Sequence, residues 1–167
     1  INLSSVTNTD IDNEELKKVL QKRLEPIIFE SRFFGNFLLD RRSNWFERKA
    51  IWMDKEIDLF LSGDLSNVPK LESQAIQLFE KQKEWDLKLR SKITEDLITL
   101  KNESWIDEGE NPLTKIEFQE KIKLENLVIH NDGDFEAWYN DGDTFWGHSI
   151  SLDGNLNGQL DEAGIHG

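Results

Sequence analysis

Residues 124–152 read LENLVIHNDGDFEAWYNDGDTFWGHSISL, and this stretch does most to decide the fold. It contains three largely apolar runs, at residues 124–130, 135–139 and 144–152, separated by two copies of Asn-Asp-Gly-Asp. Asp-Gly between such runs is a strong hairpin signal, because a type I′ turn needs positive φ at both central residues. The stretch therefore predicts a three-stranded antiparallel meander.

Three further strands are predicted upstream of the meander. Aromatic and branched residues gather at residues 33–39, 45–52 and 56–61, with polar stretches between them. In the last run Ile57, Leu59 and Leu61 alternate with other residues, which is the period of a half-buried strand.

Helices are predicted between the two groups of strands. Apolar residues recur at helical spacing over residues 69–101, a length too great for one helix in a domain of this size, so we expect a break near Trp85. Thr114 and Glu117 form a capping box for a short helix, and Asp12 and Glu15 form another for a helix that ends at Pro26.

The order of elements defines the predicted architecture. Three strands, then helices, then three strands give an α+β fold: one largely antiparallel sheet of about six strands with helices on one face. We expect a single domain over residues 31–167, preceded by an N-terminal arm and short helix at residues 1–30.

Composition narrows the cellular setting. The 167 residues include no cysteine, so disulfides and thiolate metal sites are excluded, which suits the cytoplasm, our expected location. No run approaches the roughly 18 apolar residues of a membrane span, so no membrane insertion is expected. Because the chain begins at Ile1 without methionine, we expect that an upstream segment was removed or left out.

The negative charge is concentrated at the C-terminus. Residues 124–167 contain nine acidic residues and no lysine or arginine, so they hold −9 of the net charge of −13. Nucleic-acid binding needs clustered basic residues to neutralise phosphates, so we expect none. A surface of one sign instead favours a protein partner with a basic surface.

An aromatic side chain is expected within this acidic surface. Trp138 and Tyr139 point to opposite faces of one predicted strand, so one of them should be exposed, as is typical of recognition surfaces. The residues expected to contact a basic partner are Asp132, Asp134, Glu136, Trp138, Asp141 and Asp143. Successive turns of a meander lie at opposite ends of its strands, so only part of this set can contact one partner.

A metal site is the main alternative. The doubled Asn-Asp-Gly-Asp is explained by hairpin chemistry, since turns at opposite ends of the strands cannot share an ion. Residues 153–161 (DGNLNGQLD) match an EF-hand loop at six positions, with ligands Asp153, Asn155, Asn157 and Asp161. Position twelve is Gly164 instead of the bidentate glutamate, so only a weak site for calcium or another metal is predicted.

His148 is the weak candidate for an enzyme of unknown reaction. In a strand over residues 144–152, alternation puts Trp146, His148, Ile150 and Leu152 on one face and Ser149 on the other, so Ser149 and His148 cannot form a nucleophile and base pair. With His130 and His166 it could form a three-histidine metal site, which the spacing neither supports nor forbids. Phosphate loops, nucleophile elbows and His-Glu-x-x-His are absent from the sequence, so we lean against an enzyme.

Part of the sequence resembles a known family. Residues 139–150 (YNDGDTFWGHSI), then Gly154 and residues 163–167, are similar to the end of an uncharacterised bacterial family, the domain of unknown function 2262. Trp85-Asp86, residues 102–105 and Glu117-Phe118 also fit, so the resemblance covers about residue 35 onward. It implies bacterial origin and a compact α+β domain, and it supplies no activity, cofactor or catalytic residues.

These features together predict a non-enzymatic, acidic protein-binding module without a cofactor. The expected biological type is an immunity or antitoxin-like protein that occupies the basic cleft of its partner, because acidic side chains around an aromatic anchor mimic phosphates. A weak metal-binding domain and an enzyme centred on His148 are the alternatives.

Overall fold

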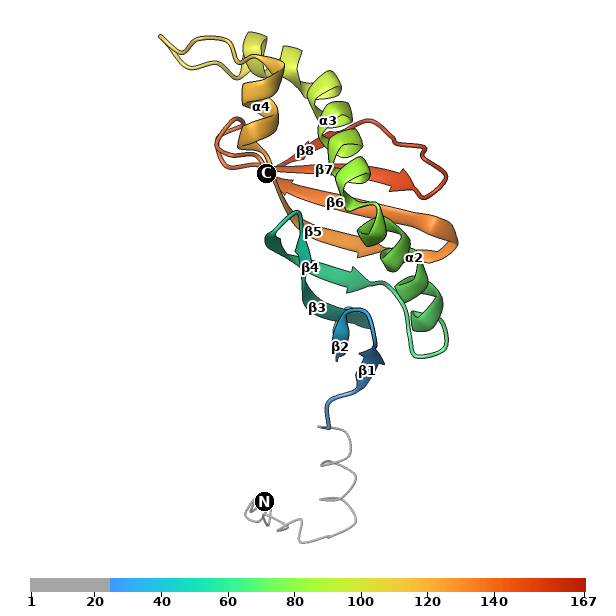
Figure 1. Ribbon diagram of the computed structural model, residues 1–167. Helices are drawn as coiled ribbons and strands as arrows, with labels where there is room; N and C mark the ends of the chain where they lie inside the picture. The colour runs from blue at the N-terminus through green and yellow to red at the C-terminus, as the bar shows by residue number, and fades with distance from the viewer. Residues whose placement is uncertain (1–24) are drawn as a thin grey trace, which may run out of the picture.

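The computed structural model describes residues 25–167, which form one mixed α+β domain (Figure 1). The arm and short helix were predicted at residues 1–30, and residues 1–24 of this range lie outside the described residues. The elements are β1 (Ile28–Ser31), β2 (Gly35–Asp40), β3 (Trp45–Trp52), β4 (Lys55–Leu61), α2 (Val68–Glu80), α3 (Gln82–Ser104), α4 (Lys115–Lys121), β5 (Lys123–Ile129), the 3-10 turn η1 (Asn131–Gly133), β6 (Asp134–Asn140), β7 (Ser149–Asn155) and β8 (Gly164–His166).

All eight strands belong to one sheet in the order of the sequence, β1 to β8. Neighbouring strands are antiparallel except β4 and β5, which run parallel with Asp58 opposite Asn126. A parallel pair needs a long crossover, and α2, α3 and α4 supply it. The largely antiparallel α+β sheet is thus confirmed.

The prediction of about six strands was wrong, because the structure has eight. The predicted run at residues 33–39 is split: its first residues form a turn, and β1 precedes that turn and pairs with β2. The other addition, β8, has three residues and pairs with the end of β7 that holds Ser149. Strands of three or four residues are too short to show a period of two in sequence.

The helical segment is interrupted as predicted, although the break lies at Lys81 and not near Trp85. The Lys81 N–H still bonds to carbonyls of α2, and α3 begins at the next residue. The predicted capping box on α4 is confirmed, because the Thr114 side chain accepts from the Glu117 N–H and the Glu117 side chain accepts from the Thr114 N–H. Within residues 25–167 no helix has both the length and the apolarity for a membrane span.

The core lies between the helices and one face of the sheet (Figure 1). Leu71, Ala75 and Leu78 of α2 and Leu89 and Ile93 of α3 are fully or almost fully buried. The strands contribute alternate residues to this core, as a pleated strand must. The other face is covered by no helix of the described range.

The two turns of the meander differ. At the first, Asp132 and Gly133 both have positive φ (63° and 88°), as the predicted type I′ turn requires. The second is an eight-residue loop, residues 141–148, so the third strand begins at Ser149 and not at residue 144. Its positive φ values fall on Gly142, Asp143, Trp146 and Gly147, and a Cβ at Gly142 would clash with the Lys121 carbonyl oxygen.

Candidate functional site: the open face of the sheet

The face of the sheet opposite the helices, here called the open face, carries a belt of aromatic side chains. The strand registers place Trp45 of β3, Phe60 of β4 and Trp138 of β6 on this face, and each is half-buried. Trp45 contacts Phe60 with ring centroids 6.1 Å apart and His130 at 6.2 Å. Trp138 lies 5.0 Å from the His166 ring of β8. Aromatic groups thus extend across much of the sheet on its uncovered side.

Acidic side chains lie beside this belt, on β6 and β7. Glu136 and Asp153 are direct cross-strand partners on the open face. His130 Nε2 donates to Glu136 Oε1 at 2.8 Å, and Trp138 Nε1 donates to Glu136 Oε2 at 3.1 Å. A carboxylate can only accept, so these two donors hold Glu136 in one orientation. Asp153 has no such donor among the described residues.

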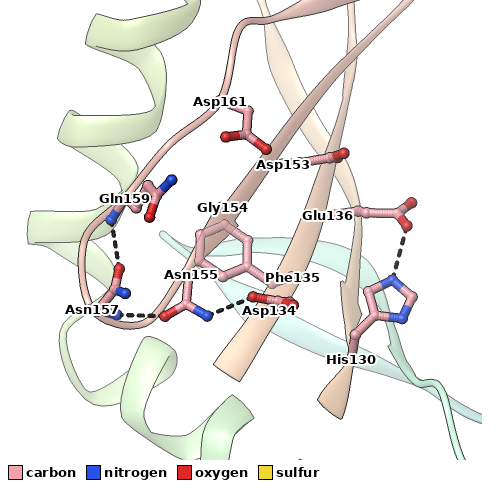
Figure 2. A pocket seen from close by; sticks show the side chains of 10 residues that line it. All are labelled: His130, Asp134, Phe135, Glu136, Asp153, Gly154, Asn155, Asn157, Gln159 and Asp161. Atoms are coloured by element: carbon pink, nitrogen blue, oxygen red, sulfur yellow. Dashed lines mark hydrogen bonds and ion pairs between the residues drawn. The ribbon is translucent and has the colours of Figure 1, made fainter. Parts of the chain in front are cut away.

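A pocket of about 410 Å³ opens beside Glu136 and Asp153, and we call it the acidic pocket (Figure 2). Four carboxylates line it: Asp134 and Glu136 from β6, Asp153 from β7, and Asp161 from the chain that returns after the 155–159 turn. Asn155, Asn157, Gln159 and His130 complete most of the wall. None of these lining residues, all in the described part of the chain, is lysine or arginine. The pocket therefore carries a concentrated negative charge.

The position of Asp153 in the acidic pocket shifts the pKa of its carboxyl. Partial burial of its carboxyl, followed by repulsion from Glu136 and Asp161, raises the pKa of Asp153 above its usual value. The nearby histidines His130 and His166 oppose this effect weakly. Like charges held together in this way are costly unless a positive group approaches them.

Replacing Asp153 with asparagine is expected to stabilise the protein at neutral pH, by less than about 1 kcal/mol because the side chain is largely exposed. When folding raises the pKa of a carboxyl, the free energy of unfolding of the protein falls as the pH rises from the pKa of the unfolded state through that of the folded state. The increase in the free energy of unfolding caused by Asp153→Asn should thus grow over that pH interval. It should vanish in acid, where the carboxyl of Asp153 is protonated in both states. Urea denaturation across acidic and neutral pH measures it, with Glu95→Gln on α3 as control; a pH-independent difference would contradict the prediction.

The residues predicted to contact a partner are only partly brought together. Glu136 and Trp138 lie on the open face, and Asp134 lines the acidic pocket. Asp132 is exposed at the same end of the sheet, where it pairs with Lys70 of α2 at 3.1 Å. Asp143 is exposed at the opposite end of β6. Trp138, and not the buried Tyr139, is the more accessible aromatic of the two.

Asp141 cannot belong to a contact surface, and its inclusion was wrong. The residue is 1 % exposed. Its carboxylate accepts from the backbone N–H groups of Asp143 (3.0 Å), Phe145 (2.7 Å) and Gly147 (3.1 Å). The carboxylate therefore organises the loop at residues 141–148 from inside.

That loop presents Trp146, which is 58 % exposed with a positive φ of 56°. Positive φ is costly for a bulky residue, and the Asp141 hydrogen bonds on either side hold it in place. The Trp146 ring lies 4.8 Å from Trp105, which follows α3. The prediction that Trp146 and His148 share a strand face with Ile150 and Leu152 was wrong, because β7 begins only at Ser149.

His148 lies at the end of the same loop, half-buried against Trp105 with ring centroids 5.2 Å apart. Its Nδ1 donates to the Phe145 carbonyl at 2.6 Å. Within residues 25–167 no acidic side chain forms an ion pair with it. This geometry favours a role in the loop's own structure, as expected for a satisfied histidine.

The EF-hand-like segment forms a tight turn in the structure. Asn155 Oδ1 accepts from the Asn157 N–H at 2.9 Å, and Asn157 Oδ1 accepts from the Gln159 N–H at 2.9 Å. The Asp161 N–H donates to the Asp153 carbonyl at 3.0 Å, which closes a hairpin. Within the described range no group of three or more His, Asp or Glu side chains is arranged to hold a metal ion.

Metal binding by Asp153, Asn155, Asn157 and Asp161 stays a prediction, and calorimetry with calcium and magnesium tests it. Two of the candidate oxygens already accept a turn hydrogen bond and the bidentate glutamate is missing, so we expect any dissociation constant to be about millimolar or weaker. Loss of the heat in Asp161→Asn would support the site. Micromolar affinity would contradict the expected weakness.

Several site residues were missed from the sequence. Trp45 was not among the predicted contact residues, although it alternates in step with the exposed residues Glu47 and Lys49 of β3. Gln159 carries no signal of its own, and His130 was considered only as a possible metal ligand. His130 enters the acidic pocket from the turn between β5 and β6, and Gln159 enters it from the turn after β7.

Comparison with protein families gives one match. The model of the family "Uncharacterized protein conserved in bacteria (DUF2262)" matches residues 31–165, well over half of the chain. The chain belongs to this family. No curated protein and no solved structure matched it.

The DUF2262 match includes β2 to β7, the first two residues of β8, the open face from Trp45 to Asp153, and the acidic pocket. It confirms the resemblance seen in the sequence and extends it a few residues toward the N-terminus. The description of the DUF2262 family names no activity, so function has to be argued from the site.

Proposed function

We propose that this domain is a non-enzymatic module that binds a basic protein through its open face. The observation that carries the proposal is the coincidence, on one uncovered sheet face, of the aromatic belt with the acidic pocket. Uncovered aromatic side chains supply apolar contact area, and the carboxylates attract and orient a positively charged surface. An immunity or antitoxin-like protein, bound to the basic cleft of its partner, is the biological type that this surface fits.

Charge arrangement supports a basic protein over nucleic acid as the partner. Lys49 of the open face is paired with Asp58 at 2.7 Å, which leaves it little charge to offer to a phosphate. The acidic pocket would repel a phosphate backbone. The same repulsion disfavours a second copy of this face as the partner.

Affinity capture from the native host tests the proposal. The chain is immobilised as wild type and as the open-face variant Asp134→Asn, Glu136→Gln, Asp153→Asn. We expect the wild type to retain a basic protein at low salt and to release it at high salt. The open-face variant should retain at least tenfold less of this protein. Each neutralised contact at an electrostatic interface is commonly worth about 1 kcal/mol or more.

A matched variant separates local from general charge effects. Glu84→Gln, Glu95→Gln and Glu103→Gln change the net charge by the same amount at exposed positions of α3. This helix variant should retain the partner. Equal loss from both variants, or retention by the open-face variant, would refute the assigned surface. A toxin gene beside the gene for this chain would favour the immunity type.

A further inference from the structure

A second pocket lies on the helix side of the sheet, and we call it the helix-side pocket. Its volume is about 460 Å³, and it lies between α4, α3 and the turn that joins β3 to β4. The inner wall is apolar and buried, with Trp52, Ile57, Ile122 and Leu124. Met53 and Ile116 stand at the rim, and Ile116 is 69 % exposed. A concave apolar wall of this size is typical of small-molecule sites.

The polar part of the pocket is a fixed ion pair. Trp52 Nε1 donates to Asp86 Oδ1 at 3.0 Å, and Arg90 Nε donates to Asp86 Oδ2 at 2.8 Å. Arg90 Nη1 donates to the carbonyls of Gln119 (2.8 Å) and Ile122 (2.6 Å), at the end of α4. Both oxygens of Asp86 are thus engaged, and Arg90 is held without freedom to reorient.

The groups of the pocket that are still free to form hydrogen bonds are N–H donors. Arg90 has five N–H groups, and its Nη2 has no partner among the described residues. Lys55 also lines the pocket and forms no ion pair within residues 25–167. Glu120 is the one lining carboxylate besides Asp86, and it is exposed on α4. An acceptor group that enters beside Arg90 therefore meets a positioned guanidinium next to an apolar wall.

We propose that the helix-side pocket binds a small molecule made of an apolar chain and a carboxylate. The carboxylate lies against Arg90 Nη2 and Lys55, and the chain lies along Trp52, Ile57 and Leu124 under Met53 and Ile116. Arg90 suits a carboxylate because its free Nη2 can give a charge-assisted hydrogen bond, and the partners of Nε and Nη1 already hold the guanidinium in place. This site is separate from the open face, so the proposal goes beyond the function given above.

Octanoate is the probe, and the indole N–H of Trp52 is the reporter. That N–H donates to Asp86 in the pocket, so its ¹H–¹⁵N resonance should shift when a ligand occupies the pocket. The resonance is assigned by its absence from the spectrum of Trp52→Phe. We expect a saturable shift with octanoate. Acetate lacks the chain and octan-1-ol lacks the charge, so each should bind at least about tenfold more weakly, a difference of about 1.4 kcal/mol.

Rim variants locate the binding without disturbing the core. Ile116→Asp puts a negative charge at the mouth and should weaken octanoate binding about tenfold, and Lys55→Gln should weaken it several-fold. Leu87→Asp is the matched control, because Leu87 is 65 % exposed on α3 and does not line the pocket. An unmoved Trp52 resonance, equal binding of octan-1-ol, or unchanged affinity in Ile116→Asp would each overturn the proposal.

Discussion

Replacing Asp86 with alanine is expected to lower the free energy of unfolding by about 3 kcal/mol or more. The change removes the acceptor for Trp52 Nε1 and the partner of Arg90 at one step. Arg90 would then be a mostly buried cation over the Tyr139 ring without a counter-charge. Urea denaturation followed by tryptophan fluorescence measures the loss.

The exposed pair of Lys49 and Asp58 provides the control for this variant. Both side chains are well exposed, so Asp58→Ala should cost less than about 1 kcal/mol. Arg90→Met should also be destabilising, because the carbonyls of Gln119 and Ile122 lose their donor. The double variant should cost less than the sum of the two single variants, since it leaves no lone charge behind. Equal costs for Asp86→Ala and Asp58→Ala would contradict the assigned network.

Replacing Asp141 with alanine is expected to cost about 2 to 3 kcal/mol and to release the loop at residues 141–148. Three backbone N–H groups lose the carboxylate that accepts them in a site closed to solvent. Without those bonds nothing offsets the positive φ of Trp146, so its contact with Trp105 should loosen. Thermal unfolding gives the stability change, and faster amide hydrogen exchange at Phe145 and Gly147 reports the loop.

Asp143→Asn is the matched variant, three positions before Trp146 in the same loop. Its side chain is exposed, and asparagine tolerates the positive φ of 66° at this position. We expect a change of less than about 0.5 kcal/mol and unaltered exchange at Phe145 and Gly147. If Asp143→Asn loosened the loop as much as Asp141→Ala, the role given to the buried carboxylate would be wrong.

The two copies of Asn-Asp-Gly-Asp show how much of the backbone conformation the local sequence predicts. At residues 131–134 the turn is the one that the sequence predicts, because Asp132 and Gly133 supply the required backbone by themselves. At residues 140–143 the same letters begin a longer loop, since Asp141 is drawn into the interior by amide groups up to six residues away. Identical tetrapeptides therefore differ in role, and the difference comes from which backbone N–H groups lie close to each aspartate.

The sequence predicted the negative charge of the candidate site, but it predicted only some of the residues that form the site. The absence of lysine and arginine after Leu124 already indicated an acidic surface, and Glu136 and Trp138 were among the residues chosen. Trp45 and Phe60 join them through the parallel pairing of β4 with β5, which joins segments some 70 residues apart in sequence. A period of two tells which residues share a face of one strand, and it does not tell which strands become neighbours.

By itself, the sequence determined the class of fold, the α4 capping box, the first hairpin turn and the acidic character of the C-terminal segment. These depend on backbone preferences and on charge, which act within a few residues. The tertiary structure decided the count of eight strands, the burial of Asp141, the pairing of Asp86 with Trp52 and Arg90, and the meeting of Asp134, Glu136, Asp153 and Asp161 around one pocket. Those features depend on strand register and helix packing, which join residues distant in sequence and leave no local pattern.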